Sequence, residues 1–279
     1  MNANIPDNDV SIEYYDSDYP SPDGPFPENV DEITEYQGVA HDVARYLEIA
    51  RETGGPVLEL CCGTGRVALP LARAGFAVTA VDVSAGMLAA LHKKLTAEGA
   101  LPVTPVRQDI TQLELERRDF PLAIIGFNSL PCIPDFTLQR RALAAIARHV
   151  APGGLLVIDA INLLSLPLSG DPVPKPFFTR RNVHSGNTYT RFALIGAMDA
   201  EQRQRLHGWY DESDAAGAVR RRHYSLLWRP IARFELQLML EGAGFEIVSL
   251  EGGHRGEAFG AGSPRMFVRA RRTDPAPVR

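Results

Sequence analysis

The sequence predicts an α/β fold: a doubly wound, mostly parallel sheet of seven strands with a small antiparallel β insertion. Three observations carry this prediction. Short apolar runs alternate with helical periodicity from residue 31 to about residue 165, and a glycine-rich turn follows the first apolar run. From about residue 171, strand-like stretches separated by turn residues replace the alternation.

The elements follow in order. Apolar runs bounded by turn residues predict buried parallel strands at 56–61, 77–82, 103–109, 120–127 and 155–161. Residues spaced three and four apart predict helices at 31–53, 66–75, 84–99, 137–150 and 231–244, with Ser84 as the N-cap of the third. Two last strands, at 245–252 and 265–272, are joined by a glycine-rich loop. Together these segments account for a sheet of seven strands.

The stretch after the fifth strand has a different pattern. Turn signals at Ser185-Gly186, near Asp199 and at Ala216-Gly217 predict three or four antiparallel strands there. We therefore divide the chain into an acidic N-terminal arm (1–30), a ligand-binding α/β core (31–165), an antiparallel lid (166–230), the C-terminal part of the core (231–272) and a tail (273–279). The arm carries tyrosines and apolar residues, so we expect it to fold over another part of the protein.

Composition narrows the function classes. The chain has 279 residues, 45% of them hydrophobic, with 29 basic against 34 acidic side chains and a net charge of −5. This balance argues against a nucleic-acid partner. Three cysteines, no signal-peptide pattern and no apolar stretch long enough for a bilayer predict a cytoplasmic protein with no membrane partner. The alanine- and arginine-rich composition suggests a bacterial protein, and we expect a role in secondary metabolism.

The segment ELCCGTGRVA (59–68) lies between the first strand and the first core helix, where an open parallel sheet binds its ligand. Gly63, Gly65 and Ala68 satisfy a dinucleotide-binding pattern, so an NAD(P)-dependent oxidoreductase is one alternative. Glu59 opposes it, because a carboxylate there would repel a pyrophosphate. It suits a ligand that carries an ammonium and a sulfonium, as S-adenosylmethionine (SAM) does.

The sequence at this point resembles the class I SAM-dependent methyltransferases. VLELCCGTGRVALPLARAGFAVTAVDVSAGMLAAL (57–91) is similar to motifs I and II of that family. The similarity continues through Gln108-Asp109-Ile110, Phe127-Asn128 and APGGLLVID, and RMFVRARR is similar to the family's closing antiparallel strand. One departure is Cys61, where the family usually has glycine, which leaves less room for the methionine part. The two adjacent cysteines are otherwise explained as small buried residues.

The resemblance implies a Rossmann-like methyltransferase fold with SAM as the cofactor and no metal. Glu59, Gly63 and Gly65 would shape the methionine and ribose pocket, Asp82 would hold the ribose diol, Asp109 would accept the adenine amino group, and Phe127 and Asn128 would lie under the sulfonium. The full predicted SAM site comprises Tyr36, Glu59, Cys61, Gly63, Gly65, Arg66, Asp82, Val83, Met87, Gln108, Asp109, Ile110, Phe127 and Asn128.

The predicted reaction is an in-line displacement onto a small-molecule acceptor, at nitrogen or oxygen rather than carbon. Candidate bases are His207, His254, Glu257 and Tyr15. Residues 171–233 hold eleven basic and six acidic side chains, so the acceptor could be anionic and meet Arg180, Arg181, Arg191, Arg220, Arg221 or Arg222, although a solvated face explains the charge equally well. A SAM-binding domain without catalysis is a further alternative. The assembly is expected to be a monomer or a homodimer.

Overall fold

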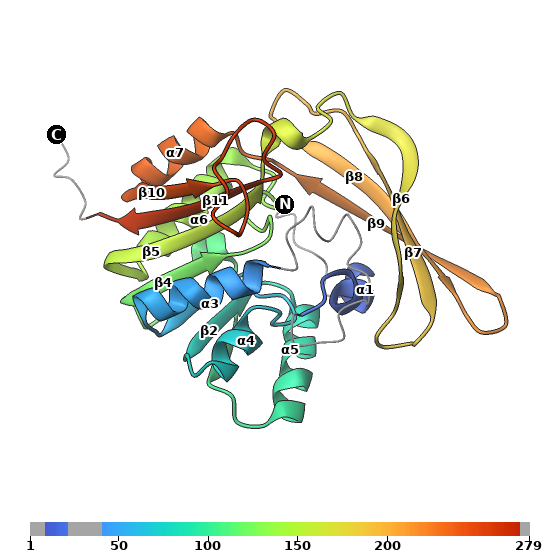
Figure 1. Ribbon diagram of the computed structural model, residues 1–279, viewed down its shortest axis with the longest axis horizontal. Helices are drawn as coiled ribbons and strands as arrows, with labels where there is room; N and C mark the ends of the chain where they lie inside the picture. Colours follow the sequence, from blue (N-terminus) through green and yellow to red (C-terminus); the bar gives the residue numbers. More distant parts are fainter. Residues whose placement is uncertain (1–8, 22–40, 274–279) are drawn as a thin grey trace.

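The computed structural model describes residues 9–21 and 41–273, and these residues form two β-sheets (Figure 1). The larger sheet has seven strands in the order β10-β11-β5-β4-β1-β2-β3. Strands β1 to β5 are mutually parallel, whereas β11 runs antiparallel to both β5 and β10. The predicted doubly wound, mostly parallel sheet of seven strands is confirmed.

The parallel strands lie close to their predicted positions. They are β1 (Val57–Leu60), β2 (Val78–Asp82), β3 (Val103–Arg107), β4 (Phe120–Ile125) and β5 (Val150–Ile161), and the closing strands are β10 (Phe245–Glu251) and β11 (Arg265–Arg272). All four residues of β1 are buried, which explains its uninterrupted apolar run. Strand β5 begins five residues before its predicted start, because its pairing with β4 continues past an irregularity between Phe120 and Leu122.

Helices cover both faces of this sheet. On one face lie α3 (Asp42–Thr53), α4 (Ala68–Arg73) and α5 (Ala85–Glu98), and on the other lie α6 (Phe136–Ala147) and α7 (Arg233–Gly242). Ser84 caps α5 as predicted, since its hydroxyl accepts from the Met87 N–H at 3.3 Å. Two short 3₁₀ turns, η1 (Ile110–Gln112) and η2 (Leu163–Ser165), follow β3 and β5. The described segments contain no helix that is long and apolar enough to cross a membrane.

The insertion forms a second sheet, which we call the lid sheet. Its four antiparallel strands follow chain order: β6 (Asp171–Arg181), β7 (Thr188–Ile195), β8 (Gln204–Ser213) and β9 (Val219–Trp228). The three predicted turns fall between these strands. In Figure 1 the lid sheet curves away from the main sheet, with α1 between the two.

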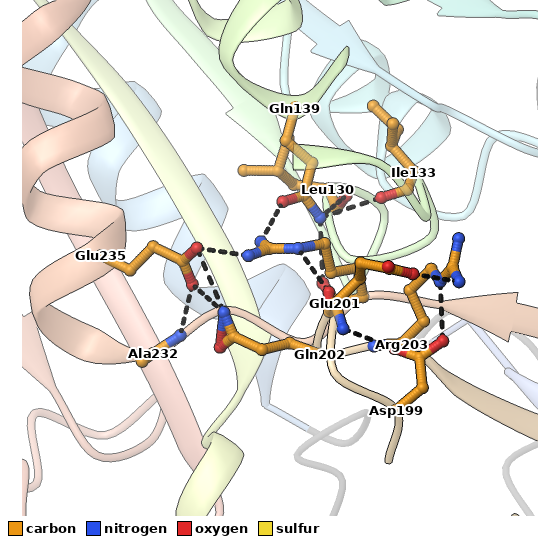
Figure 2. Close-up of polar contacts among 10 residues, drawn as sticks. Leu130, Ile133, Gln139, Asp199, Glu201, Gln202, Arg203, Ala232 and Glu235 are labelled. Atoms are coloured by element: carbon orange, nitrogen blue, oxygen red, sulfur yellow. Dashed lines mark hydrogen bonds and ion pairs between the residues drawn. The ribbon is translucent and has the colours of Figure 1, made fainter. Parts of the chain in front are cut away.

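A polar cluster fixes the base of the lid sheet to the core (Figure 2). The Arg229 guanidinium donates to Gln139 Oε1 of α6 at 2.9 Å, to Glu235 Oε1 of α7 at 2.5 Å and to the Glu201 carbonyl at 3.1 Å. A hollow of about 280 Å³ opens beside these residues. Because Arg229 directly follows β9, this cluster holds the lid at the point where the chain returns to the core.

The N-terminal arm folds as expected over the part that the structure describes. Helix α1 (Ser11–Asp18) packs on the inner face of the lid sheet, where Tyr14 is fully buried and stacks on Tyr210 with 3.9 Å between ring centroids. The apolar cluster around Tyr14 and Tyr210 also contains Val10, Phe178 and Tyr189. A helix in the arm was not predicted, since SIEYYDSD shows no helical apolar period.

Candidate active site

The glycine loop between β1 and α4 has the backbone of a close-contact site. Gly65 has a φ of +86°, and a Cβ at this position would lie 2.5 Å from the Leu91 side chain. Gly63 has a φ of +55°, and a Cβ there would lie 3.1 Å from the Tyr15 hydroxyl. Cys61, just before them, is also left-handed at +59°. These conformations favour glycine, so the loop lets another group lie directly against its backbone.

Glu59 is buried at the end of β1, and its Oε2 atom has no hydrogen-bond partner among the described residues. Burial, opposed by Arg66 and reinforced by Asp82, raises the pKa of Glu59 to about 8. A buried carboxyl with a free oxygen is costly unless a cation or donor meets it. Glu59 is therefore suited to bind a positively charged group brought in by a ligand.

Asp82 lies at the carboxyl end of the neighbouring strand. Its Oδ2 accepts from the Gly63 N–H at 2.8 Å and its Oδ1 from the Ser84 N–H at 2.9 Å. Burial raises the pKa of Asp82, and these backbone donors partly offset the increase. The two hydrogen bonds fix the carboxylate beside the glycine loop, and its remaining lone pairs can accept from a ligand.

The ends of β2 and β3 supply the other predicted contacts on this side. Met87 and Ile110 are buried, and Val83 is half-buried. Asp109 caps η1 by accepting from the Thr111 N–H at 2.8 Å. The Gln108 side chain donates to and accepts from the Glu114 backbone, so it closes a loop rather than facing a ligand.

Arg66 is paired within the chain. Its guanidinium donates to both carboxylate oxygens of Asp42, at 2.9 and 2.5 Å, and both residues are buried. This bidentate pair joins the glycine loop to α3. Tyr36, also predicted at the site, lies outside the described residues.

The turn after β4 carries two residues in left-handed conformations, Phe127 at +42° and Asn128 at +62°. Asn128 donates its N–H to the Asp159 carbonyl and accepts from the Ile161 N–H at 2.7 Å, so it ties the ends of β4 and β5 together. The Arg66 and Arg265 guanidinium groups lie 5.6 and 5.3 Å from the Phe127 ring centroid. The strained turn is thus held in place from several sides.

Helix α1 lies against the glycine loop as well as the lid. Asp16 accepts from Thr64 Oγ1 at 2.6 Å and from Lys94 Nζ at 2.7 Å. Tyr15 points its hydroxyl at Gly63, and burial raises its pKa well above the ordinary value for tyrosine. The Tyr15 phenol therefore keeps its proton at neutral pH.

Of the other three predicted bases, His207 lies on the lid sheet, and His254 and Glu257 share the loop after β10. His207 is exposed on the outer face of the lid sheet, opposite to the buried Tyr210. Glu257 is exposed in the loop after β10 and accepts from the Arg255 N–H at 2.8 Å. His254, in the same loop, is buried, with its Nε2 3.1 Å from Asp159 Oδ2.

Asp159 and Arg265 were not predicted at the site. Arg265 donates to Asp159 Oδ1 through Nε at 2.9 Å and through Nη2 at 2.7 Å. Burial opposes ionisation of Asp159, but Arg265 and His254 outweigh it and hold the pKa of this carboxyl well below its usual range. The sequence does place Asp159 and Arg265 at the ends of adjacent strands, but only the pairing of β5 with β11 shows that they meet.

The chain matches known proteins over this same region. Residues 57–154 match the family described as a methyltransferase domain. A demethylmenaquinone methyltransferase of Mycobacterium marinum is 35% identical over 63% of this chain and 70% of its own length. The chain is a class I SAM-dependent methyltransferase. The glycine cradle and the partnerless Glu59 oxygen fit the cofactor of that family, whose methionine carries an ammonium.

Other similar proteins support this methyltransferase's family and fold. The cypemycin N-terminal methyltransferase of a Streptomyces species is 29% identical over 77% of this chain and 82% of its own length. The CcbJ methyltransferase of Streptomyces caelestis has the same fold, with a TM-score of 0.74 over 98% of this chain and all of that one at 24% identity. SAM-bound CalS10, an amino pentose methyltransferase from Micromonospora echinaspora, has a TM-score of 0.66 over 87% of this chain and 92% of that one at 23% identity.

Proposed function

We propose that this methyltransferase transfers the methyl group of SAM to the amine of a small molecule, such as an amino sugar, or to a peptide N-terminus. The observation that carries the proposal is the position of α1, which lies between the glycine loop and the lid sheet and contacts both. A lid with a covering helix suits a compact acceptor that must be shielded from water. The acceptors named for CalS10 and for the cypemycin enzyme both offer an amine.

The SAM contacts we propose follow the strand ends. Glu59 would meet the α-amino group, the backbone at Gly63 and Gly65 the methionine part, and Asp82 the ribose hydroxyls. Cys61, Val83, Met87, Asp109 and Ile110 would enclose the remainder, with Phe127 and Asn128 nearest to the methyl group. When bound, SAM supplies a methyl group on a sulfonium, which needs only an aligned lone pair. We leave the side chains of Arg66 and Gln108 out of these contacts, since both are hydrogen-bonded within the chain.

An anionic acceptor is not part of the proposal. Five of the six lid arginines predicted to meet an anion donate to groups of the chain itself: Arg180 to the Ser17 and Asp18 carbonyls, Arg181 to the Gly186 carbonyl, Arg191 to Asp18, Arg221 to Asp211 and Arg222 to Glu13. These guanidinium groups are therefore already paired with carboxylates or hydrogen-bonded to backbone carbonyls before a substrate binds. This favours an acceptor without a carboxylate or phosphate.

An amine is protonated at neutral pH and has to lose a proton before it can attack. Among the predicted bases, we propose His254 for this step. Asp159 lies 3.1 Å from its Nε2 and would orient the ring. His207 is exposed on the outer face of the lid, and the pKa of Tyr15 is too high for a base at neutral pH.

The test has two stages. Calorimetric titration with SAM, with S-adenosylhomocysteine and with NAD should give binding of the first two and none of NAD. The protein is then incubated with SAM and a panel of an aminopentose, an aminohexose and a short peptide, each beside its hydroxy or N-acetylated analogue, and the products are analysed by mass spectrometry. Methylation of amines alone supports the proposal, whereas methylation of the hydroxy analogues alone overturns N-methylation.

A further inference from the structure

Arg191 of β7 occupies an unusual position on the inner face of the lid sheet. Its Nη1 donates to Asp18 Oδ2 at 2.9 Å and to the Tyr19 hydroxyl at 3.1 Å. Its Nε donates to the Tyr224 hydroxyl at 2.8 Å, and the guanidinium lies 4.8 Å from the Tyr224 ring centroid. One side chain thus joins the end of α1 to two strands of the lid.

The charge of Arg191 is balanced by Asp18. The Asp18 carboxylate is buried and also accepts from the Tyr189 hydroxyl at 2.7 Å and from the Tyr210 hydroxyl at 2.8 Å. An arginine with a buried carboxylate partner has little to gain from binding a second anion. The role of Arg191 must therefore be sought in the neutral groups that it holds, the Tyr19 and Tyr224 phenols, of which Tyr19 also contacts Phe127 at the end of β4.

Tyr19 lies between the lid and the end of β4. Its ring meets the Phe127 ring edge-on at 4.9 Å between centroids and the Tyr15 ring at 5.1 Å. The Tyr19 oxygen accepts from Arg191, and no described residue accepts its proton. A phenol can accept and donate at once, so this oxygen is fixed while its O–H remains able to donate to another molecule.

The lid makes room for this arrangement. A Cβ at Gly208 would lie 2.4 Å from the Tyr224 ring, so the ring crosses directly over β8 at a position where only glycine fits. Tyr224 reaches Arg191 by this route. Aromatic rings and a glycine on three adjacent strands thus serve to hold one guanidinium in a fixed orientation.

We propose that Arg191 is a positioning residue of the acceptor site, and that the Tyr19 hydroxyl it holds donates a hydrogen bond to the acceptor. This inference rests on the proposed function and specifies its substrate further. The acceptor carries an uncharged oxygen or nitrogen lone pair, such as a ring oxygen, hydroxyl or peptide carbonyl, beside the amine that is methylated. Tyr19 contacts the acceptor, whereas Arg191 affects the acceptor only through Tyr19.

Steady-state kinetics with the best amine of the panel tests this, on the full chain with saturating SAM. Tyr19→Phe should lower kcat/KM for the acceptor about 10- to 100-fold, the usual effect of removing one hydrogen bond to a substrate, and leave the SAM dissociation constant within about threefold. Arg191→Lys keeps the positive charge but loses the planar guanidinium that binds several partners at once, and it should lower kcat/KM less than Tyr19→Phe does. In the double variant, Arg191→Lys should add nothing to Tyr19→Phe, because it acts through the missing hydroxyl.

Tyr189→Phe is the matched control. It removes a phenol that binds the other oxygen of Asp18 and touches neither Arg191 nor Tyr19 through a hydrogen bond. If Tyr19 only supported the fold, both Phe variants would lower the melting temperature and kcat/KM alike, and the inference would be overturned. Unchanged kcat/KM in Tyr19→Phe, or additive losses in the double variant, would overturn it too.

The outcomes separate this inference from the proposed function. A wild-type protein that binds SAM but methylates only the hydroxy analogues contradicts the proposed function before any variant is made. A wild-type protein that methylates an amine, with Tyr19→Phe equally active, contradicts the role of Tyr19 and Arg191 alone.

Discussion

At the glycine-loop edge of the main sheet, the carboxyl groups of Glu59 and Asp82 meet only backbone donors or no donor at all, whereas Asp18 of α1, against the lid sheet, is surrounded by side-chain donors of the lid. Both regions bury carboxyl groups, which is costly in the absence of partners. The glycine-loop edge leaves hydrogen-bonding capacity for a ligand, and the lid uses its own groups to hold α1 in place. The difference shows that buried carboxyl groups can remain available to a ligand in one region and hold two parts of the chain together in another.

The largest expected effect comes from removing the Asp18 carboxylate, which the lid donors surround. Asp18→Ala leaves the half-buried Arg191 guanidinium without its carboxylate, and removing one partner of a largely buried pair costs about 3–5 kcal/mol of unfolding free energy. Urea unfolding measures it. The control is Asp16→Ala, which removes a more exposed pair with Lys94 and should cost about 1 kcal/mol. Equal losses in the two variants would contradict the assembly role of Asp18.

The second prediction concerns Glu59 and pH. Its pKa of about 8 in the folded protein lies above the ordinary value of 4.5, so the folded state binds this proton more tightly. The stabilisation is fully present below pH 4.5 and is lost as the pH rises towards 8. Between pH 5 and 7, in the absence of SAM, the unfolding free energy of the wild type should therefore fall by about 3 kcal/mol relative to that of Glu59→Gln.

Melting temperatures of both proteins at the two pH values check this prediction. Parallel stability profiles would mean that Glu59 is ionised in the free protein. In a separate calorimetric titration, Glu59→Gln should bind SAM more weakly, because the amide offers no charge to an ammonium.

The third prediction sharpens the role of the glycine loop. Gly65 and Gly75 are both left-handed, at +86° and +93°, but a Cβ at Gly75 would meet nothing within 4 Å. Both alanine variants bear the backbone strain, and only Gly65→Ala adds the clash with Leu91. Gly65→Ala should therefore cost about 2 kcal/mol more than Gly75→Ala in chemical unfolding. Similar costs would show that Leu91 moves aside freely.

The smallest expected effect concerns Asp82. Asp82→Ala removes a carboxylate that we propose for the ribose hydroxyls, so it should weaken SAM binding by about 1–3 kcal/mol in calorimetry. Asp199→Ala, on an exposed turn far from the glycine loop, should leave the affinity unchanged. Unchanged affinity in Asp82→Ala would mean that the ribose lies elsewhere.

The two regions also differ in how well the sequence predicts them. In the core, apolar runs and glycines are local signals, so the strands, Ser84 as a cap and the turns of the lid were predicted correctly. Helix α1 gives no such signal, because Tyr14, Asp16 and Asp18 are buried or paired by partners 48 to 198 residues away. On the acceptor side, the sequence predicted Arg191 only as a partner for an anion and did not predict Tyr19, since the roles that we propose for both depend on that docking.

Helix α1 bears on how such enzymes can be recombined. Asp16 binds the glycine loop and Asp18, two residues further, binds the lid, so eight residues make specific contacts with both layers. A chimaera that takes its lid from a relative but keeps its own N-terminus would leave Asp18 without matching donors. Exchange of the lid between relatives would then require the gene segments that encode α1 and the lid sheet to be inherited together, although they are not contiguous.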